Sequence, residues 1–396
     1  MIQAPDTSSG RWHRAGWIIQ DPKTVLQNAM IHISAGRITA VKTGHQTGRD
    51  PVVDHGPGVI LPALINVHTH LELGALKGKL SAGRGFADWV RRLIQLRENL
   101  SRTALDGGIS DGIGELIRSG CGAVGEISTL GISRQPFLDS RLHGVWFREY
   151  IGNRSDEESL PELPANRESL AGHAPHTTGP DLLIALKQAA NRLSRPFSIH
   201  LAESGDESDF IRTGTGPWAD LLKTRKIDFS TWPLSARSPV HYLDRLNILD
   251  ERTVAVHVLQ ADADDFQILA RRGTSVAVCP RSNLRLHRQL PDLNRMDAAG
   301  LNICMGTDSL ASCDSLSMFD EMAFTARSFP DLSLRSIFAM ATTNAARALG
   351  MENTCGRIAP GYRTGCLYLP LSAASPKMLI EQIVHAPADH PIERVN

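Results

Sequence analysis

The sequence contains two histidines spaced by one residue, His68 and His70, at the end of an apolar run. Alternate side chains of a strand point to the same side, so both imidazoles can bind one metal ion. Two further potential ligands end apolar runs farther along the chain, His200 in FSIH and Asp308 in ICMGTD. Three imidazoles and one carboxylate suit Zn²⁺ and also accommodate Fe²⁺. We therefore expect one divalent metal ion, Zn²⁺ ahead of Fe²⁺, bound by these four side chains.

Two more polar residues follow apolar runs and could move protons near such an ion. Glu203 comes three residues after His200, in HLAES. A bound metal lowers the pKa of its water toward about 7, so a nearby carboxylate can act as general base and then as acid. His257 ends VAVH and could be a second-metal ligand, a catalytic histidine or a hydrogen-bonded core residue.

The segments that position these residues alternate between apolar runs and helical patterns. Helical patterns occur, for example, at 87–100, 181–193 and 262–273. The strand candidates are 59–70, 120–129, 143–152, 169–178, 196–204, 253–260, 274–283 and 301–309. Eight strands alternating with helices predict an α/β fold, a parallel (β/α)₈ TIM-like barrel. Such barrels build their sites at the C-terminal strand ends, where this chain places His68, His70, Glu126, Glu149, His173, His200, His257 and Asp308.

Short β-prone pieces flank this region at both ends of the chain. They fall at 15–20, 29–34, 36–42 and 50–54 before it, and at 356–360, 366–370 and 379–386 after it. We expect the two ends to pair into one small β-sandwich domain beside the barrel. The predicted domains are residues 1–60 plus 356–396 for the sandwich and 61–355 for the catalytic barrel. The polar stretch 154–170 is predicted to be an exposed loop.

The composition narrows the class of protein. The chain has 396 residues, 42% of them hydrophobic, which is enough for one barrel and a smaller partner domain. Lys plus Arg and Asp plus Glu both number 42, so no charge excess argues for nucleic acid or an anionic membrane. The six cysteines form no CxxC pair, and no apolar run approaches the roughly 18 residues of a spanning helix. We expect a cytoplasmic protein that acts on a small molecule and could form a homodimer.

The motifs together resemble the amidohydrolase superfamily, in its single-metal branch of deaminases and chlorohydrolases. The matching pieces, between about residues 59 and 348, are LINVHTHLE, GHAPHTTGPDLL, IHLAES, AVHVLQ, VAVCPRSNLRL and MGTDSLAS. Binuclear relatives bridge two metals with a carbamylated lysine on the fourth strand, but no lysine lies between His143 and Leu182 here. The resemblance thus implies a single metal, with His257 steadying the attacking oxygen.

The implied reaction is hydrolytic deamination at a cyclic amidine carbon. Glu203 would accept a water proton and deliver it to the adjacent ring nitrogen, while Asp308 would help to protonate the leaving ammonia. The pieces HTHLEL, HLAESGDESDF and SPVHYLDRLNIL are most similar to aminofutalosine deaminases, which implies 6-amino-6-deoxyfutalosine as substrate. Deamination of S-adenosylhomocysteine, methylthioadenosine or a guanine compound remains an alternative, as does chlorohydrolase or amide hydrolase activity on the same barrel.

Several substrate contacts follow from the same resemblance. His173 belongs to a HAP piece that matches a substrate-binding strand end. Where relatives have HAPY, this chain has His176, which could alter the pocket wall. Glu72 and Phe86 are further candidates for the pocket.

Two charged residues have competing interpretations. Glu98, nine residues after Trp89, matches a glutamate that holds ribose hydroxyls in adenosine-type relatives, but could equally be an ordinary helix-surface residue. Arg148 could meet a substrate carboxylate, pair with Glu149 or lie at the surface.

Two other classes of protein fit the sequence less well. The cytidine-deaminase fold needs H-x-E and a later PCxxC for its zinc. His70-Leu71-Glu72 supplies the first motif, but the sequence contains no PCxxC. A non-catalytic relative of the barrel enzymes would be expected to have lost ligands, whereas all six reactive positions are intact here.

Overall fold

The computed structural model describes residues 10–44, 50–81, 83, 85–153, 163 and 167–396. Most of the predicted loop 154–170 lies outside these residues. Its last three residues, from Glu168 onward, already belong to a strand rather than a loop.

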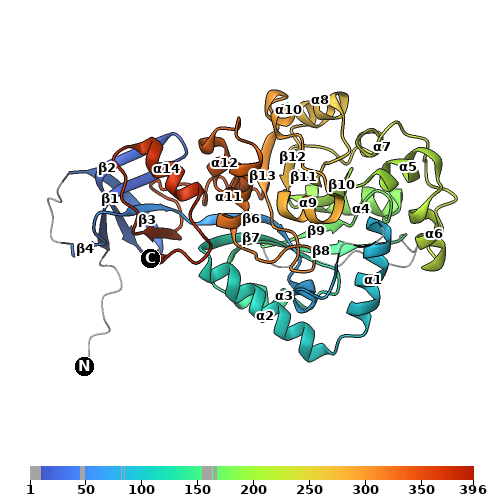
Figure 1. The fold of residues 1–396 in the computed structure, drawn as a ribbon, viewed down its shortest axis with the longest axis horizontal. Helices are drawn as coiled ribbons and strands as arrows, with labels where there is room; N and C mark the ends of the chain where they lie inside the picture. The colour runs from blue at the N-terminus through green and yellow to red at the C-terminus, as the bar shows by residue number, and fades with distance from the viewer. Residues whose placement is uncertain (1–9, 45–49, 82, 84, 154–162, 164–166) are drawn as a thin grey trace.

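Eight parallel strands form the main sheet and pair in chain order (Figure 1). They are β6 (Leu64–Thr69), β7 (Cys121–Ser128), β8 (His143–Tyr150), β9 (Glu168–Gly172), β10 (Phe197–Leu201), β11 (Thr253–His257), β12 (Ser275–Val278) and β13 (Asn302–Met305). Helices cover the strands, which explains why the strands are continuous apolar runs rather than alternating ones. The predicted (β/α)₈ barrel is confirmed.

The end of β13 meets the first barrel strand, β6. The backbone N–H groups of Thr307 and Asp308 donate to the carbonyl oxygen of His68, at 3.1 and 3.0 Å. This contact brings the two ends of the barrel sheet together. It also places the acidic residue at the eighth strand end beside the histidines at the first.

The connections between barrel strands are mostly helical. Before β10 they contain η1 (Leu71–Leu76), α1 (Phe86–Glu98), α2 (Arg102–Arg118), α3 (Arg134–Asp139) and α4 (Pro180–Arg192). Between β10 and β13 they contain α5 (Gly205–Thr213), α6 (Pro217–Thr224), α7 (Pro239–Arg245), α8 (Ala263–Arg272), α9 (Pro280–His287) and α10 (Leu293–Ala298). After β13 come α11 (Met318–Ser328), α12 (Leu334–Met340) and α13 (Thr343–Ala348).

A second sheet, of mixed direction, joins strands from both ends of the chain (Figure 1). Its strands are β1 (Arg11–Asp21), β2 (Thr24–Ser34), β3 (Arg37–Thr43), β4 (Val52–Asp54), β5 (Val59–Pro62), β14 (Cys366–Leu369) and β15 (Glu393–Val395). The late strand β14 runs antiparallel to β5, so the expected pairing of the two ends occurs. The expected small domain is built on this one connected sheet of seven strands.

Two of the β-prone pieces near the C-terminus are not strands. Most of the piece 379–386 lies in helix α14 (Pro376–Val384), which buries Leu379, Ile380, Ile383 and Val384. That spacing has the period of a helix, and Ser375 caps the first turn. The piece 356–360 makes one strand-like contact, from the N–H of Ile358 to the carbonyl of Gln20 at 2.8 Å.

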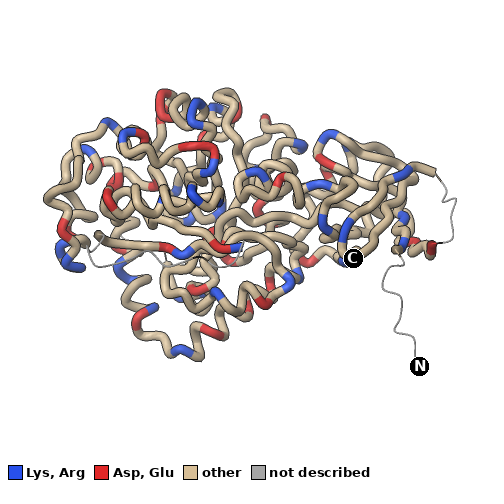
Figure 2. The backbone as a smooth tube through the Cα atoms, turned by 180° about the vertical axis from the view of Figure 1, so that it is seen from behind, with Lys and Arg blue, Asp and Glu red and all other residues tan. Residues whose placement is uncertain are grey.

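Charged residues of both signs are interspersed along the backbone (Figure 2). Over the described part of the chain, no helix combines the length and the apolar character that crossing a membrane requires.

Candidate active site

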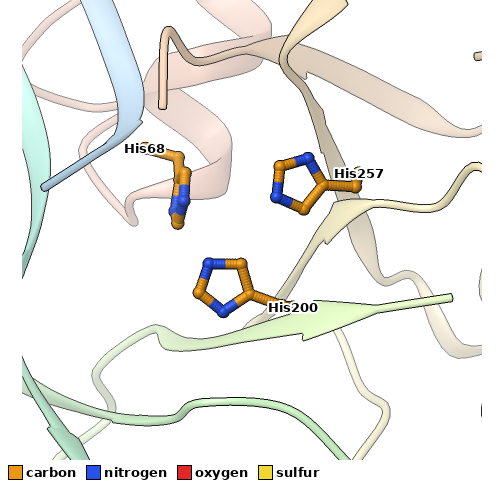
Figure 3. Close-up of side chains that lie close together, drawn as sticks. All are labelled: His68, His200 and His257. Carbon is orange, nitrogen blue, oxygen red and sulfur yellow. The ribbon is translucent and has the colours of Figure 1, made fainter. Parts of the chain in front are cut away.

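Three imidazoles from three barrel strands point toward one another at the C-terminal end of the barrel (Figure 3). One ring nitrogen each from His68, His200 and His257 lies within 4.8 Å of the other two. His68 also belongs to a second group of this kind, with His70 and Asp308. The four ligands predicted from the sequence are therefore gathered around His68, with His257 adjoining them.

The second group is compact. His68 Nε2 lies 3.1 Å from His70 Nε2, and Asp308 Oδ1 lies 3.9 and 3.7 Å from these two nitrogens. Burial, with smaller effects from the neighbouring imidazoles, holds the pKa of His68 well below its ordinary value. Burial also lowers the pKa of His70. Both rings are thus neutral at pH 7, the form in which imidazole binds metals.

Hydrogen bonds orient the other two predicted ligands. His200 Nδ1 lies 2.6 Å from the carbonyl oxygen of His173, so this nitrogen carries the proton and Nε2 keeps its lone pair. Asp308 Oδ2 accepts hydrogen bonds from the hydroxyls of Ser282 and Ser312, at 2.7 and 2.6 Å, while Oδ1 faces the histidines. A buried donor set oriented in this way fits one divalent metal ion.

Two site residues occupy the left-handed backbone region, which non-glycine residues rarely adopt. His257 has φ +74° and Asp308 has φ +59°. Such conformations cost about 1–3 kcal/mol each and persist where the surrounding structure enforces them. At Asp308 the hydrogen bond from its N–H to His68 supplies that constraint.

Glu203 is buried and held by two histidines. Its Oε1 lies 3.0 Å from His287 Nε2 and 3.6 Å from His257 Nε2. Burial alone would raise the pKa of Glu203, but His257 and His287 outweigh it and hold the pKa below the usual value. The carboxylate is therefore ionised at neutral pH and can accept a proton.

An amide on α9 orients His257. Asn283 Nδ2 lies 2.9 Å from His257 Nδ1. With the amide in this orientation, Nδ1 accepts, Nε2 carries the ring proton and that proton faces Glu203. The sequence interpretation did not single out Asn283 or His287. Their spacing of four residues on a helix that directly follows a barrel strand is the signal that could have found them.

A pocket of about 300 Å³ opens above these groups. Its inner end is lined by His70, Glu149, His173, His200, Glu203, His257 and Asp308. His173 Nδ1 lies 2.6 Å from the Thr177 hydroxyl, and burial lowers the pKa of His173 to about 3. Phe86 also lines the pocket. His176 does not reach the pocket surface but packs at 4.1 Å, between ring centres, against Trp218, which does.

Arg148 and Glu98 are not among the described residues that line the pocket. Arg148 follows the alternation of β8, so it points away from the side that Glu149 faces, and its guanidinium lies 5.9 Å from the centre of the Tyr150 ring. Glu98 Oε1 lies 2.8 Å from Arg225 Nη2, and the Glu98 side chain is 53% exposed.

Glu72 has a different environment from the one expected of a substrate contact. Its buried carboxylate accepts hydrogen bonds from the Ser128 hydroxyl at 2.6 Å and from the N–H groups of Leu130 and Ile132 at 2.7 and 2.9 Å. Glu72 thus holds the turn that follows β7, and it is absent from the described pocket lining.

We predict that Glu72→Gln lowers the free energy of unfolding by about 1–3 kcal/mol, because an amide NH₂ would face backbone donors in a buried site. Thermal unfolding of the metal-loaded protein measures this effect. Glu98→Gln is the matched control, since an exposed ion pair contributes only about 0–1 kcal/mol. Unchanged stability together with a raised KM would instead indicate that Glu72 contacts the substrate.

Comparisons with known proteins agree with this geometry. The model of the amidohydrolase family matches residues 59–364. A 5'-deoxyadenosine deaminase of Methanothrix thermoacetophila is 29% identical over 360 residues, which cover 83% of this chain and 79% of that protein. An aminodeoxyfutalosine deaminase of Deinococcus radiodurans is 29% identical over 313 residues, which cover 74% of this chain and 73% of that protein.

Solved structures share the fold over almost the full length. A Helicobacter pylori aminofutalosine deaminase in complex with methylthio-coformycin gives a TM-score of 0.84 at 23% identity, covering 98% of this chain and 100% of that chain. An adenosine deaminase of Xanthomonas campestris with bound zinc gives 0.79 at 22% identity, covering 96% of this chain and 90% of that chain. The family model spans the barrel and every predicted ligand. The chain therefore belongs to the amidohydrolase family and is a metal-dependent enzyme.

Proposed function

We propose that this enzyme hydrolytically deaminates the adenine ring of a nucleoside derivative. The observation that carries the proposal is the position of Glu203. This ionised carboxylate lies beside the four predicted ligands, at the inner end of a pocket whose remaining walls are mostly apolar. An apolar pocket suits a flat heteroaromatic ring, and a buried base beside the metal group suits attack of water on it. The names of the similar deaminases agree with this reaction.

The predicted metal ligands and Glu203 have separate roles in the proposed reaction. His68, His70, His200 and Asp308 would hold a metal ion, for which we propose zinc, and the bound ion would lower the pKa of water so that it can attack at neutral pH. Glu203 accepts the proton of that water and delivers it to the ring nitrogen next to the reacting carbon.

Two other groups assist Glu203. His257 hydrogen-bonds the attacking oxygen through Nε2 and so keeps it in line with the ring carbon. The Asp308 carboxylate accepts the remaining proton of the attacking water from the hydroxyl group on the ring carbon and passes it to the amine, so that ammonia leaves and a ring carbonyl forms. Its other oxygen stays fixed by Ser282 and Ser312.

The substrate we propose is 6-amino-6-deoxyfutalosine, ahead of S-adenosylhomocysteine, methylthioadenosine and 5'-deoxyadenosine. The test is ammonia release by the zinc-loaded enzyme from these four compounds, from adenosine, and from guanosine and cytidine as other ring types. We expect the highest kcat/KM with an adenosine derivative that carries a modified ribose. Absence of ammonia from all of them, with one zinc per chain bound, contradicts deamination. Chloride release from a chlorinated triazine would then identify the chlorohydrolase alternative.

A further inference from the structure

Three side chains of helix α9 each hold one reacting group of the site. The pairs are Ser282 with Asp308, Asn283 with His257, and His287 with Glu203. All three side chains belong to less than two turns of one helix, so a displacement of that helix moves the three contacts together. Misplacement by about 1 Å can lower a rate roughly 10²-fold, and the placement of α9 therefore bears directly on turnover.

The start of α9 has no capping side chain of its own. Its N-cap residue, Cys279, makes no side-chain cap hydrogen bond, and Pro280 in the first turn has no backbone N–H. The first N–H of the helix that needs an outside acceptor is therefore that of Arg281. This N–H donates to Oε1 of Glu321 at 2.9 Å. Glu321 belongs to α11, which packs against α9, and it supplies the acceptor that a polar N-cap residue usually provides.

Stability does not explain a carboxyl group at this position. Glu321 is fully buried, and burial raises its pKa to about 7. Because the folded state then binds the proton more tightly than the unfolded chain, stability falls as pH rises from the ordinary pKa of glutamate to this value. Among the described residues, the other oxygen of Glu321, Oε2, has no hydrogen-bond partner. The contact that remains to account for Glu321 is its hydrogen bond to the start of α9.

We propose that Glu321 is a positioning residue: its hydrogen bond to the start of α9 keeps that helix where its three side chains orient the reacting groups. Arg281 strengthens the same attachment, because its guanidinium donates to the carbonyl and hydroxyl oxygens of Ser315, at 3.3 and 3.2 Å, shortly before α11. A carboxyl group presents an acceptor oxygen in both of its protonation states, so the reach of Glu321 matters more than its charge. This inference rests on the proposed deamination, because turnover of a nucleoside reports it.

Three replacements of Glu321 separate reach from charge, each assayed at saturating zinc with the nucleoside that the wild type deaminates fastest. Glu321→Leu removes the acceptor and should lower kcat about 10–100-fold while KM stays within about threefold, because the residues that line the pocket are unchanged. Glu321→Gln keeps an oxygen at the same reach and should retain kcat within about threefold. Glu321→Asp keeps the charge on a shorter side chain, so its kcat should lie below that of Glu321→Gln.

Asp265→Leu is the matched control. Asp265 is also a buried carboxylate, and it accepts the N–H of Asp262 at 3.1 Å at the start of α8. None of the described residues of α8 lines the pocket. This variant should therefore keep kcat within about twofold even where its Tm falls, because the lost cap supports no residue of the site.

Two results with Glu321→Leu overturn the inference: a wild-type kcat, or a loss of kcat that Asp265→Leu shows equally. If Glu321→Leu does not fold, the other two variants decide. A kcat of Glu321→Asp equal to or above that of Glu321→Gln would show that charge matters and reach does not, which also overturns the inference. All of these results leave the deaminase assignment intact. Absence of ammonia from every nucleoside of the panel above, with the wild-type enzyme, rejects the deaminase assignment itself.

Discussion

Glu203→Gln is expected to lower kcat by about 10²–10⁴-fold, the usual range for removal of a general acid–base group. The amide has nearly the shape of the carboxylate but cannot accept a proton from water at neutral pH. Glu203 is not one of the predicted ligands, so the variant should retain one metal ion per chain. Steady-state kinetics together with metal analysis of the same samples measure both quantities.

Variants of the two histidines that hold Glu203 separate its chemical role from its placement. His287 contacts Glu203 but is absent from the described pocket lining, so His287→Ala should cost less activity than Glu203→Gln. His257 lines the pocket as well as facing Glu203, so its loss removes two interactions. A Glu203→Gln variant with full metal content and near-normal turnover would show that another group moves the proton.

The fold was largely predictable because the two features that identify a barrel strand, a short apolar run and a reactive residue at its end, are local in the sequence. Nearly every barrel strand is a short apolar run that ends in a reactive side chain, and this pattern does not depend on distant contacts. The piece 379–386 was assigned incorrectly because a short apolar segment is ambiguous between the two periods. Its neighbours Ser375 and Pro376, a cap followed by a proline in the first turn, favour the helix.

The placement of a site residue was predictable where the end of a strand determines the direction of its side chain. It was not predictable where a segment distant in the sequence determines the environment of that side chain. His68, His200 and Asp308 end strands of one parallel barrel, so they must converge. Glu72 follows the same strand as His68, yet its carboxylate accepts hydrogen bonds from a turn that lies more than fifty residues later in the sequence. Only the packing of that turn on η1 determines the environment of Glu72.

Strand alternation and helix orientation account for the remaining differences. Arg148 and Glu149 are neighbours on β8, so only one of the two can face the pocket, and the sequence does not state which. His287 reaches Glu203 only because α9 leaves the end of β12 at the angle that brings its last turn over the barrel. That angle is a property of the packed helices and has no local signature.

Asp308→Asn is expected to remove the metal ion and with it measurable turnover. The carboxylate is the one anionic group among the four predicted ligands, and the Asn amide keeps its size while losing the charge that offsets a divalent cation. Chelation of the wild-type protein with dipicolinate should have the same effect, and added zinc should restore activity. Binding to the folded state alone also stabilises it, by about 4 kcal/mol at a thousandfold excess over Kd, so zinc should raise the Tm of the chelated wild type.

The control for this prediction is Asp297→Asn, an equal charge change at an exposed residue of α10. It should keep one metal ion per chain, the wild-type turnover and the rise in Tm on addition of zinc. In Asp308→Asn, zinc should raise Tm by much less than in the wild type, because the variant has lost the one anionic ligand of a divalent cation. Full metal content and full turnover in Asp308→Asn would show that Asp308 is not a metal ligand. Full turnover of metal-free wild type would reject the metal centre, because the remaining groups, Glu203 and His257, have no means of making water nucleophilic enough by themselves.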